Sequence, residues 1–467
     1  MNKKSFIILS LILVFQIVCF IPSMKISAAS TTISGIVTTN GTSFILDGKV
    51  FRFAGCNNYD LFTYGDGSND ATPDDIETKY MNKARIDEMM SNMASDGIKV
   101  VRTWGFSHET WHGFESQKGV YNEAQFMLFD YILESAKKHN IKVIIVLENY
   151  WEAYGGIDTR LKWEGLPGIT HPNRAAFFTN AGCKEQYKNY VKHFVTRINH
   201  YTNEPYKNDP AIFSWELMNE PRYQDVSEEE NLNGTTLRAW VDEMGKLIKE
   251  LDPNHMVSTG LEGQAAKYGY GANAGNPFVY IHQSPYIDFT TAHPYPDEGW
   301  AGLSPDQAAK LVATWIDESH NIVKKPFVME EFNTHNNKEQ YWNAMYEQIE
   351  KLNASGDLFW AYASYSGGFY LTHGDPLLKS VFAPHAEKMA QDIPVNPVTL
   401  GDLNGDGSVN ALDLAMLKKY LLGNISDFPV EDDLGAADVN GDQNIDALDY
   451  AVVKSYILQL ITEFPKK

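Results

Sequence analysis

Short apolar runs and longer amphipathic stretches alternate along the chain from about residue 50 to about residue 390. The short runs are rich in β-branched and aromatic residues, which is typical of buried strands. In the longer stretches apolar residues recur every three or four positions, as they do on one face of a helix. The pattern predicts strands at residues 51–57, 99–104, 142–149, 212–220, 256–260, 288–295, 327–333 and 358–364.

The helical pattern is clearest at residues 128–140 and 238–253, and a strand hairpin is expected at residues 33–48. Repeated strand–helix units of this kind predict an α/β fold in which a parallel (β/α)8 TIM barrel is surrounded by helices. A doubly wound open sheet is the alternative, but no glycine-rich phosphate loop follows any early strand. We therefore expect a barrel.

The predicted strands end in polar residues. In parallel barrels the C-terminal ends of all strands meet at one mouth, where catalytic side chains gather. The polar and aromatic residues at these ends are Asn57, Asn58, Arg102, Glu148, Asn219, Glu220, Glu262, His293, Tyr295, Glu330, Glu331 and Trp360. A purely structural barrel would not need carboxylates, an arginine and a histidine around one mouth, so the pattern predicts an enzyme.

Two carboxyl groups, one protonated and one ionised, are what the hydrolysis of a glycosidic bond requires. Several strand ends offer glutamate, so spacing alone does not choose among them. The segments WELMNEPR, with Asn219 and Glu220, and MEEFN, with Glu331, resemble the signatures of glycoside hydrolase family 5. The resemblance implies that Glu220 is the acid/base, that Asn219 binds the substrate 2-hydroxyl, and that Glu331 is the nucleophile.

Other positions match the same family one by one. Arg102 in VVRTWGF resembles the arginine that orients the nucleophile, and His293 and Tyr295 in HPYPD resemble the pair after the sixth strand. Trp360 resembles the tryptophan that forms the floor of the −1 sugar site. The family usually has glycine where Asn333 stands here, which is expected to shift the local backbone without removing the nucleophile.

Residues on or near the loops that follow the strand ends are predicted to bind sugar, because sugar rings stack on aromatic side chains in such clefts. These predicted substrate-binding residues are Trp104, Trp151, Arg222, Trp300 and Trp360. For Arg222 the family resemblance implies contact with a sugar on the aglycone side. Glu148 and Glu262 are expected to be subsite or structural carboxylates, and Glu330 to face the helices or to pair with a basic group.

The resemblance also implies a retaining reaction through a covalent glycosyl-enzyme, with the two carboxyl groups about 5–5.5 Å apart. We expect Arg102 to keep Glu331 ionised and the pKa of Glu220 to be raised beside a second carboxylate. No metal or organic cofactor is expected for this reaction.

The sequence indicates the substrate less specifically than it indicates the reaction. The segments RTWGF, YWEAYGG, DPNHMVSTG and HPYPD resemble the endo-β-1,4-mannanase branch of family 5, so we expect cleavage of internal bonds in mannan, galactomannan and glucomannan. An endo-β-1,4-glucanase of the same family is the alternative, because nothing in these residues distinguishes an axial from an equatorial 2-hydroxyl. A transglycosylase and a non-catalytic polysaccharide-binding protein are further alternatives.

Two acidic loops follow near the C-terminus, DLNGDGSVNALD at residues 402–413 and DVNGDQNIDALD at residues 438–449. Oxygen side chains stand at loop positions 1, 3, 5 and 12, a spacing that lets one short loop offer Ca²⁺ its roughly 6–8 oxygen ligands. Gly407 suits the sharp turn at position 6 better than Gln443 does. With position 7 included, the predicted ligands of the two sites are Asp402, Asn404, Asp406, Ser408, Asp413, Asp438, Asn440, Asp442, Asn444 and Asp449.

Each loop is followed by one helix, and the duplicated loop and helix resembles a type I dockerin, which docks secreted plant-wall enzymes on a cohesin domain of a cellulosome scaffold. The resemblance implies cohesin contacts at Ala411, Leu412, Lys418, Ala447, Leu448 and Lys454. The alternative is that Leu412 and Leu448 belong to the helix core. We expect so small a module to fold only with calcium bound, because metal binding supplies folding free energy.

The N-terminus predicts secretion. Lys3 and Lys4 precede an apolar run, which ends before the small residues at 27–29, as in a secretory signal peptide. An uncleaved membrane anchor is the alternative. The expected organisation is a signal peptide at 1–29, a catalytic barrel at 30–391, a linker at 392–399 and a dockerin at 400–467.

The net charge of −21 argues against nucleic acid and anionic membranes as partners. The family resemblances imply a polysaccharide and a cohesin as partners, outside the cell. Cys56 and Cys183 remain after removal of the signal peptide, and the sequence leaves open whether they form a disulfide or two buried thiols.

Overall fold

The computed structural model describes residues 35–64, 82–391, 400–404, 408–428, 430, 433–442 and 444–465. The expected signal peptide and linker lie outside the described residues, as do Asp406, Gly407 and Gln443.

Eight parallel strands form one sheet in the spatial order β8-β7-β6-β5-β4-β11-β10-β9. They are β4 (Phe53–Asn57), β5 (Val100–Trp104), β6 (Lys142–Val146), β7 (Ile212–Glu216), β8 (Met256–Ser258), β9 (Thr290–Ala292), β10 (Phe327–Phe332) and β11 (Gly356–Trp360). Between the two ends of this sheet, the amide of Asp288 donates to the carbonyl of Val257 at 2.9 Å, and the Asp288 carboxylate accepts from the Val257 amide at 2.6 Å. These bonds bring the ring almost to closure, and the predicted barrel is confirmed.

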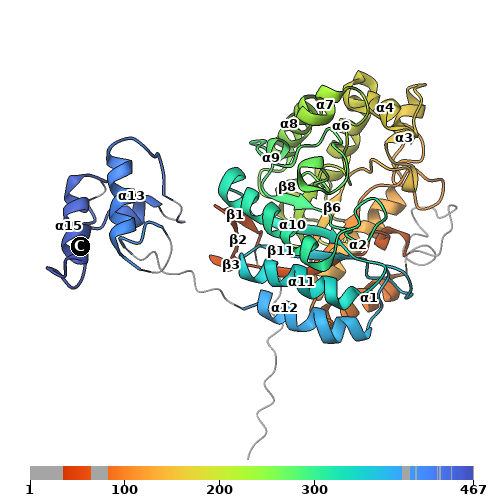
Figure 1. The fold of residues 1–467 in the computed structure, drawn as a ribbon. Coiled ribbons are helices and arrows are strands. Elements are labelled where there is room, and N and C mark those ends of the chain that lie inside the picture. Colours follow the sequence, from red (N-terminus) through yellow and green to blue (C-terminus); the bar gives the residue numbers. More distant parts are fainter. Residues whose placement is uncertain are drawn as a thin grey trace, which may run out of the picture. The chain divides into compact units, whose positions relative to one another are not determined.

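Helices follow the strands and lie around the outside of the sheet (Figure 1). The longer ones are α1 (Lys83–Ser95), α2 (Glu123–Lys138), α6 (Ala181–Val195), α8 (Thr235–Leu251), α10 (Pro305–Asp317) and α11 (Lys338–Lys351). The shorter ones are α3 (Gly156–Trp163), α4 (His171–Arg174), α5 (Ala176–Thr179), α7 (Glu228–Asn233), α9 (Phe278–His282) and α12 (Ala383–Met389). Within the described ranges, no helix combines the length and apolar character that a membrane crossing requires.

The strands are shorter than the sequence predicted. β6 and β7 end at Val146 and Glu216, and segment 51–57 divides into β4 and the end of a separate strand, β3 (Lys49–Phe51). Beyond β7 the backbone still bonds to its neighbours, since the Asn219 amide donates to the carbonyl of Glu148 at 2.8 Å. The irregular conformation of these ends aims polar side chains at the mouth.

A small antiparallel sheet covers the N-terminal end of the barrel. It consists of the predicted hairpin, β1 (Thr38–Asn40) and β2 (Ser43–Leu46), with β3 added. Buried Phe44 of β2 belongs to an apolar layer with one residue from, or next to, each barrel strand: Phe53, Val100, Ile144, Phe213, Met256, Phe289, Val328 and Leu358. Its ring meets Phe213 and Phe289 edge-on, with centroids 5.0 and 5.3 Å away.

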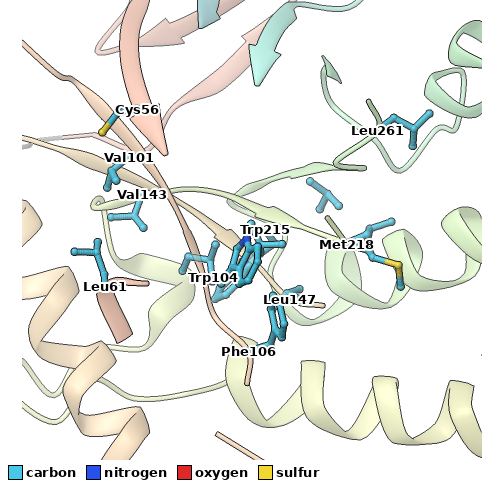
Figure 2. Packing of buried hydrophobic residues seen from close by; sticks show 14 of the residues in the cluster. Cys56, Leu61, Val101, Trp104, Phe106, Val143, Leu147, Trp215, Met218 and Leu261 are labelled. Atoms are coloured by element: carbon cyan, nitrogen blue, oxygen red, sulfur yellow. The ribbon is translucent and has the colours of Figure 1, made fainter. Parts of the chain in front are cut away.

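A second, larger core fills the space between the sheet and the helices, and Figure 2 shows part of it. Because successive strand residues point to opposite faces, Val101 and Trp215 contribute to this outer core while their neighbours point inward. The indole N–H of Trp215 donates a hydrogen bond to the Asp252 carboxylate there, at 2.8 Å. Cys56 and Cys183 are both buried free thiols, which answers the question that the sequence left open.

The C-terminal module has its own core. It contains α13 (Ala411–Leu421), α14 (Asp433–Ala437) and α15 (Ala447–Ile457), of which α14 was not predicted. The buried apolar residues of this core are Leu403, Leu417, Phe428, Ala436, Ala437, Val439 and Val453. Both longer helices begin with the same capping box, Asn410 with Asp413 and Asp446 with Asp449. The two sequence repeats therefore fold alike locally.

The Phe44 contacts predict that the substitution Phe44→Ala lowers the free energy of unfolding by about 3–5 kcal/mol, because a large ring leaves a cavity in a closed layer. Denaturant titration of the purified protein measures this loss. Thr38→Ala, at an exposed position of the same hairpin, is the control and should change the value by less than about 0.5 kcal/mol. A loss below about 1 kcal/mol for Phe44→Ala would mean that the layer does not depend on this ring.

Candidate active site and cation-binding loops

Arg102 lies at the centre of the barrel mouth and is fully buried. It points inward from β5 and donates from Nε and Nη2 to the two oxygens of Glu216, at 2.7 and 2.5 Å. Nη1 donates to Glu331 at 2.5 Å and to Asn57 at 3.0 Å, and Nη2 donates to Asn219 at 2.7 Å. One guanidinium therefore fixes four side chains, which come from β4, from β10, and from β7 and the segment that follows it.

Glu220 follows β7 in a left-handed backbone conformation, with φ of +50°. For a residue with a Cβ this conformation costs about 1–2 kcal/mol. The Glu220 amide donates to the carbonyl of Gly260 at 2.9 Å, which helps to hold the turn. The carboxylate lies 2.9 Å from Nδ1 of His293 and accepts from the Trp151 indole at 2.7 Å. The side chain is thus oriented on both oxygens.

Glu331 on β10 accepts from the Tyr295 hydroxyl at 2.7 Å, in addition to Arg102. Strict alternation would send only one of Glu330 and Glu331 into the barrel, but the pairing of β10 with β11 shifts register between Met329 and Phe332. Such a bulge re-aims side chains. Glu330 therefore also lies inside, with Oε2 3.4 Å from Nε2 of His293, which corresponds to the expected pairing with a basic group rather than to the helix-facing alternative.

Asn333, which stands where the family usually has glycine, turns its amide toward the last strand. Its Nδ2 donates to the carbonyl of Trp360 and, at 2.9 Å, to the carbonyl of Phe369. The nucleophile candidate keeps its place, as the sequence predicted.

An oxygen of Glu220, a ring nitrogen of His293 and an oxygen of Glu331 all lie within 4.8 Å of one another. This closeness fits a retaining site, since an inverting pair needs about 6.5–9.5 Å to admit water. A histidine and two carboxylates can also hold a metal ion. Here, however, Arg102 and Tyr295 already occupy the oxygens of Glu331, so the arrangement suits sugar and proton chemistry better.

The pKa directions of the two carboxyl groups are the reverse of those expected. Burial opposes ionisation of Glu220, but the hydrogen bond and the charge of His293 outweigh it and lower the pKa of Glu220 to about 2. Burial raises the pKa of Glu331, and the charges of His293 and Arg102 offset this only in part. Despite its burial, His293 has its pKa raised to about 10, with the negative charge of Glu331 as the largest cause. These directions favour a proton on His293 over one on Glu220.

A cleft beside the two carboxyl groups contains several predicted sugar contacts. It is lined by Trp151, Arg222, Trp300, His293, Tyr295 and Phe369, among others. Arg222 lies over the Trp151 ring, 4.8 Å from its centroid, and donates to Glu262 at 2.6 Å. Trp300 is 48% exposed and offers an open ring to the cleft. Glu262 therefore holds Arg222 in place, which corresponds to the structural carboxylate that the sequence analysis allowed for.

Trp360 and Trp104 lie in an aromatic cluster around Tyr59. The Trp360 ring stacks on Tyr59 with 5.0 Å between centroids and an interplanar angle of 7°. Trp104 is only 4% exposed, and its centroid is 5.2 Å from that of Tyr59. Trp104 therefore supports this cluster and does not present an open face to a sugar.

Glu148 takes part in a buried ion network rather than in the cleft. It pairs with Arg160 and lies 3.2 Å from Nε2 of His108. Arg160 also donates to Glu115 at 3.0 Å. Burial raises the pKa of Glu148, but the positive charges of Arg160 and His108 outweigh it and lower that pKa to about 2.

Sequence reasoning missed Glu216 and Phe369. Glu216 precedes Glu220 by four residues in the same segment, and the alternation along β7 could have marked it as inward-facing. Phe369 lies in the long connection after β11 and contacts Tyr295, with ring centroids 5.6 Å apart. No sequence pattern marks that position.

The first acidic loop folds back on the carboxylate at its last position. Asp413 is buried and accepts from the amides of Leu403, Asn404 and Asn410 at 2.8, 3.0 and 2.7 Å. This brings both ends of the loop together. Asp406 lies outside the described residues, so this loop is described without its position-5 ligand.

The second loop shows the same arrangement more fully. The Asp442 amide donates to Asp438 and Asn440 at 3.0 and 2.8 Å, and Asp449 accepts from the amides of Asn440 and Asp446 at 3.3 and 2.9 Å. Burial raises the pKa of Asp449, and the negative charges of Asp438 and Asp442 add to the effect. Carboxylates crowded in this way fit a divalent cation such as Ca²⁺, which would bring them the missing positive charge.

The residues predicted to contact a partner are exposed on α13 and α15. Leu412 and Leu448 are 63% and 60% exposed, so the alternative that they belong to the helix core is wrong. The other four, Ala411, Lys418, Ala447 and Lys454, are exposed as well. Each repeat thus exposes the same three kinds of side chain, namely an alanine, a leucine and a lysine.

Known proteins resemble both parts of the chain. The sequence profile described as "GH family 5 beta-mannosidase-like" matches residues 34–369, and the one described as "Dockerin type I domain" matches residues 400–458. "Mannan endo-1,4-beta-mannosidase 3" of Arabidopsis thaliana is 32% identical over 387 residues, which cover 77% of this chain and 88% of that protein.

Solved structures show the same likeness. An endo-1,4-beta-mannanase from Rhizomucor miehei matches with a TM-score of 0.65 and 29% identity, over 76% of this chain and 99% of that one. An endo-beta-1,4-glucanase from Xanthomonas axonopodis pv. citri matches with a TM-score of 0.50 and 17% identity, over 73% of this chain and all of that one, and so shares the fold alone.

The ion network of Glu148 predicts a stability effect that depends on pH. Since the folded-state pKa is about 2 and the ordinary value is 4.5, ionised Glu148 stabilises the fold above about pH 4.5 and loses this effect as the pH falls toward 2. Glu148→Gln should therefore lower the free energy of unfolding at pH 7 by about 3 kcal/mol. The difference from the parent protein should shrink as denaturant titrations move from pH 7 to pH 3.

Glu347→Gln, at an exposed position, is the control and should give the parent curve at each pH. A difference for Glu148→Gln that stays constant with pH would contradict the role of charge in this network.

Proposed function

Because the chain belongs to glycoside hydrolase family 5 and ends in a type I dockerin domain, we propose that it is a secreted, retaining endo-β-1,4-mannanase that docks on a cohesin-bearing scaffold. Its substrates in this proposal are mannan, galactomannan and glucomannan. The catalytic barrel takes up residues 30–391, after a signal peptide at 1–29, and a linker at 392–399 joins it to the dockerin at 400–467.

One observation carries the catalytic part of the proposal. Glu220 and Glu331 lie together at the mouth of the barrel, and every oxygen of the two is oriented by a bond to a neighbouring side chain. Such a pair on a retaining spacing has one use that fits all its contacts, which is the double displacement of a sugar.

In the first step of this mechanism, Glu331 attacks the anomeric carbon while the glycosidic oxygen takes a proton from Glu220. Arg102 and Tyr295 hold Glu331 in line for the attack through bonds of 2.5 and 2.7 Å. In this proposal the proton that Glu220 delivers comes from His293, along their 2.9 Å contact. The products are a shortened chain and a covalent glycosyl-enzyme.

In the second step the ionised Glu220 removes a proton from water, whose oxygen displaces Glu331 from the sugar. Glu220 passes this proton back to His293 along the same contact and Glu331 is again ionised, so the site returns to its starting state. Asn219, oriented by Arg102 and Asn149, is the residue proposed to bind the 2-hydroxyl.

The named activities of the relatives support mannan over glucan as substrate. The cleft that starts at Glu220 fits a polymer, since Arg222, Trp151 and Trp300 line it on the side of the leaving group. Hydrolysis of glucans remains the competing proposal within the family.

The dockerin supports attachment to a scaffold. We propose two Ca²⁺ sites, formed by the two acidic loops, and a cohesin contact formed by Leu412 and Leu448 with the neighbouring alanines and lysines. The metal would supply the folding free energy of the module and no step of the reaction.

The substrate proposal is tested by reducing-sugar release from galactomannan, glucomannan, mixed-linkage glucan and soluble cellulose. We expect activity on both mannans, with kcat lowered at least about 10³-fold by Glu220→Gln and by Glu331→Gln, since each removes one of the two carboxyl groups. Glu339→Gln, an exposed residue of α11, is the control with unchanged kcat. Activity confined to glucans would make the enzyme a glucanase, and products longer than the substrate would indicate transglycosylation.

Chelation separates the two parts of the chain. Treatment with EDTA should abolish cohesin binding and leave the rate of mannan hydrolysis unchanged, because the barrel's mechanism uses no metal. Surface plasmon resonance on an immobilised cohesin and the reducing-sugar assay measure the two effects on one sample. Loss of hydrolysis while circular dichroism still reports a folded barrel would contradict this division.

A further inference from the structure

Two more carboxyl groups lie in the barrel below Glu220 and Glu331. Glu216, the last residue of β7, and Glu330 of β10 are both fully buried, and neither lines the cleft. We call Glu216 and Glu330 the lower pair. Nothing in the mechanism above uses them, yet charge of this kind is costly to bury without a function or a partner.

We call Glu220 and Glu331 the upper pair. A cation joins each member of the lower pair to one member of the upper pair. Arg102 bonds to Glu331 with one arm of its guanidinium and to Glu216 with the other arm and Nε. His293 faces Glu220 through Nδ1 at 2.9 Å and Glu330 through Nε2 at 3.4 Å. Two cations thus link two layers of carboxyl groups.

Apart from Arg102 and His293, little around the lower pair offsets its negative charge. Oε1 of Glu330 has no hydrogen-bond partner among the described residues. On the β8 side Gly260 leaves room for Glu216, since a Cβ there would stand 2.3 Å from Glu216 Oε1. Four carboxyl groups face two cations, so full ionisation would leave two uncompensated negative charges in a buried site. Such a cluster holds on to protons.

The charged groups that face the lower pair are Arg102 from β5 and His293 after β9. These two cations also face Glu331 from β10 and Glu220 after β7. Burial raises the pKa of Glu216 to about 8; Arg102 opposes this rise, and the charge of Glu330 adds to it. Glu216 therefore takes up its negative charge mainly on the alkaline side of neutrality, and the titration of the mouth is shared by the whole cluster.

We propose that Glu216 and Glu330 are positioning residues that act through Arg102 and His293, and that their negative charge keeps the proton delivered by Glu220 within the site into the alkaline range. This inference rests on the proposed glycosidase mechanism. In this proposal the lower pair extends the pH range in which the enzyme is active, and it also orients Arg102 and His293.

The sign of the effect follows from electrostatics. A carboxylate near His293 and Glu220 favours their protonated forms, so a neutral amide in its place lets the proton leave at lower pH. In the variants Glu330→Gln and Glu216→Gln, the alkaline limb of kcat/KM should move to lower pH by about 1 unit or more. Glu216→Gln should also lower kcat at the optimum about tenfold or more, because Arg102 loses its bidentate partner. KM should stay within about twofold in both variants, since neither side chain reaches the cleft.

The control is Asp357→Asn. Asp357 is a fully buried carboxyl group on β11 that faces outward to His385, with Oδ2 2.7 Å from Nε2. This variant should lower the melting temperature and leave the alkaline limb in place. If Glu216→Gln and Glu330→Gln lose stability or activity but keep the parent alkaline limb, the lower pair is only structural and the proposal fails. If one variant does not fold, the other decides.

A measurement on the parent protein does not depend on activity. With ¹⁵N-histidine labelling, and His293→Asn to assign the signal, NMR should report both ring nitrogens of His293 protonated at pH 7. A neutral ring at pH 7 in the parent protein would overturn the proposal. Absence of hydrolysis on every glycan would instead contradict the proposed function, while the NMR titration would still test the lower pair.

Discussion

The mouth of the barrel depends on one buried positive charge. Arg102 has no contact with solvent, and its five donor contacts go to Asn57, Glu216, Asn219 and Glu331. An unpaired guanidinium in such a place would be strongly unfavourable, so the carboxylates around it are as necessary to the fold as they are to the chemistry. The fixed fork of the side chain also sets the angles at which these groups meet, which a lysine could not do.

The two parts of the chain balance their negative charge in different ways. In the barrel, Arg102 and His293 belong to the protein and are always in place among the glutamates. In the C-terminal module, Asp438, Asp442 and Asp449 crowd together, which is a typical arrangement for binding a cation from solution. If the proposed Ca²⁺ sites are occupied, folding of the C-terminal module would depend on the cation concentration of the medium, whereas folding of the barrel would not.

The sequence predicted the barrel well because strand and helix periods alternate regularly, and it predicted that Glu220 and Glu331 lie at the mouth because each stands at the end of a predicted strand. The details that it could not predict depend on contacts between distant segments. The bulge in β10 brings Glu330 inside, and the pKa direction of Glu220 depends on the place of His293, which comes from another strand. Strand ends were overestimated, since β7 stops at Glu216 and the backbone then turns to a left-handed residue at Glu220.

The apolar layer at the N-terminal end of the barrel has a consequence for how the chain folds. Phe44 is near the start of the chain, yet it packs in one layer with Leu358 of the last strand and with a residue from every strand between. This layer cannot form until the final strand has been synthesised, so contacts of very high sequence separation complete the domain. Until then the aromatic side chains of the layer lack their partners. A nascent chain in that state is prone to aggregate, and a chaperone or rapid completion of synthesis would reduce this tendency.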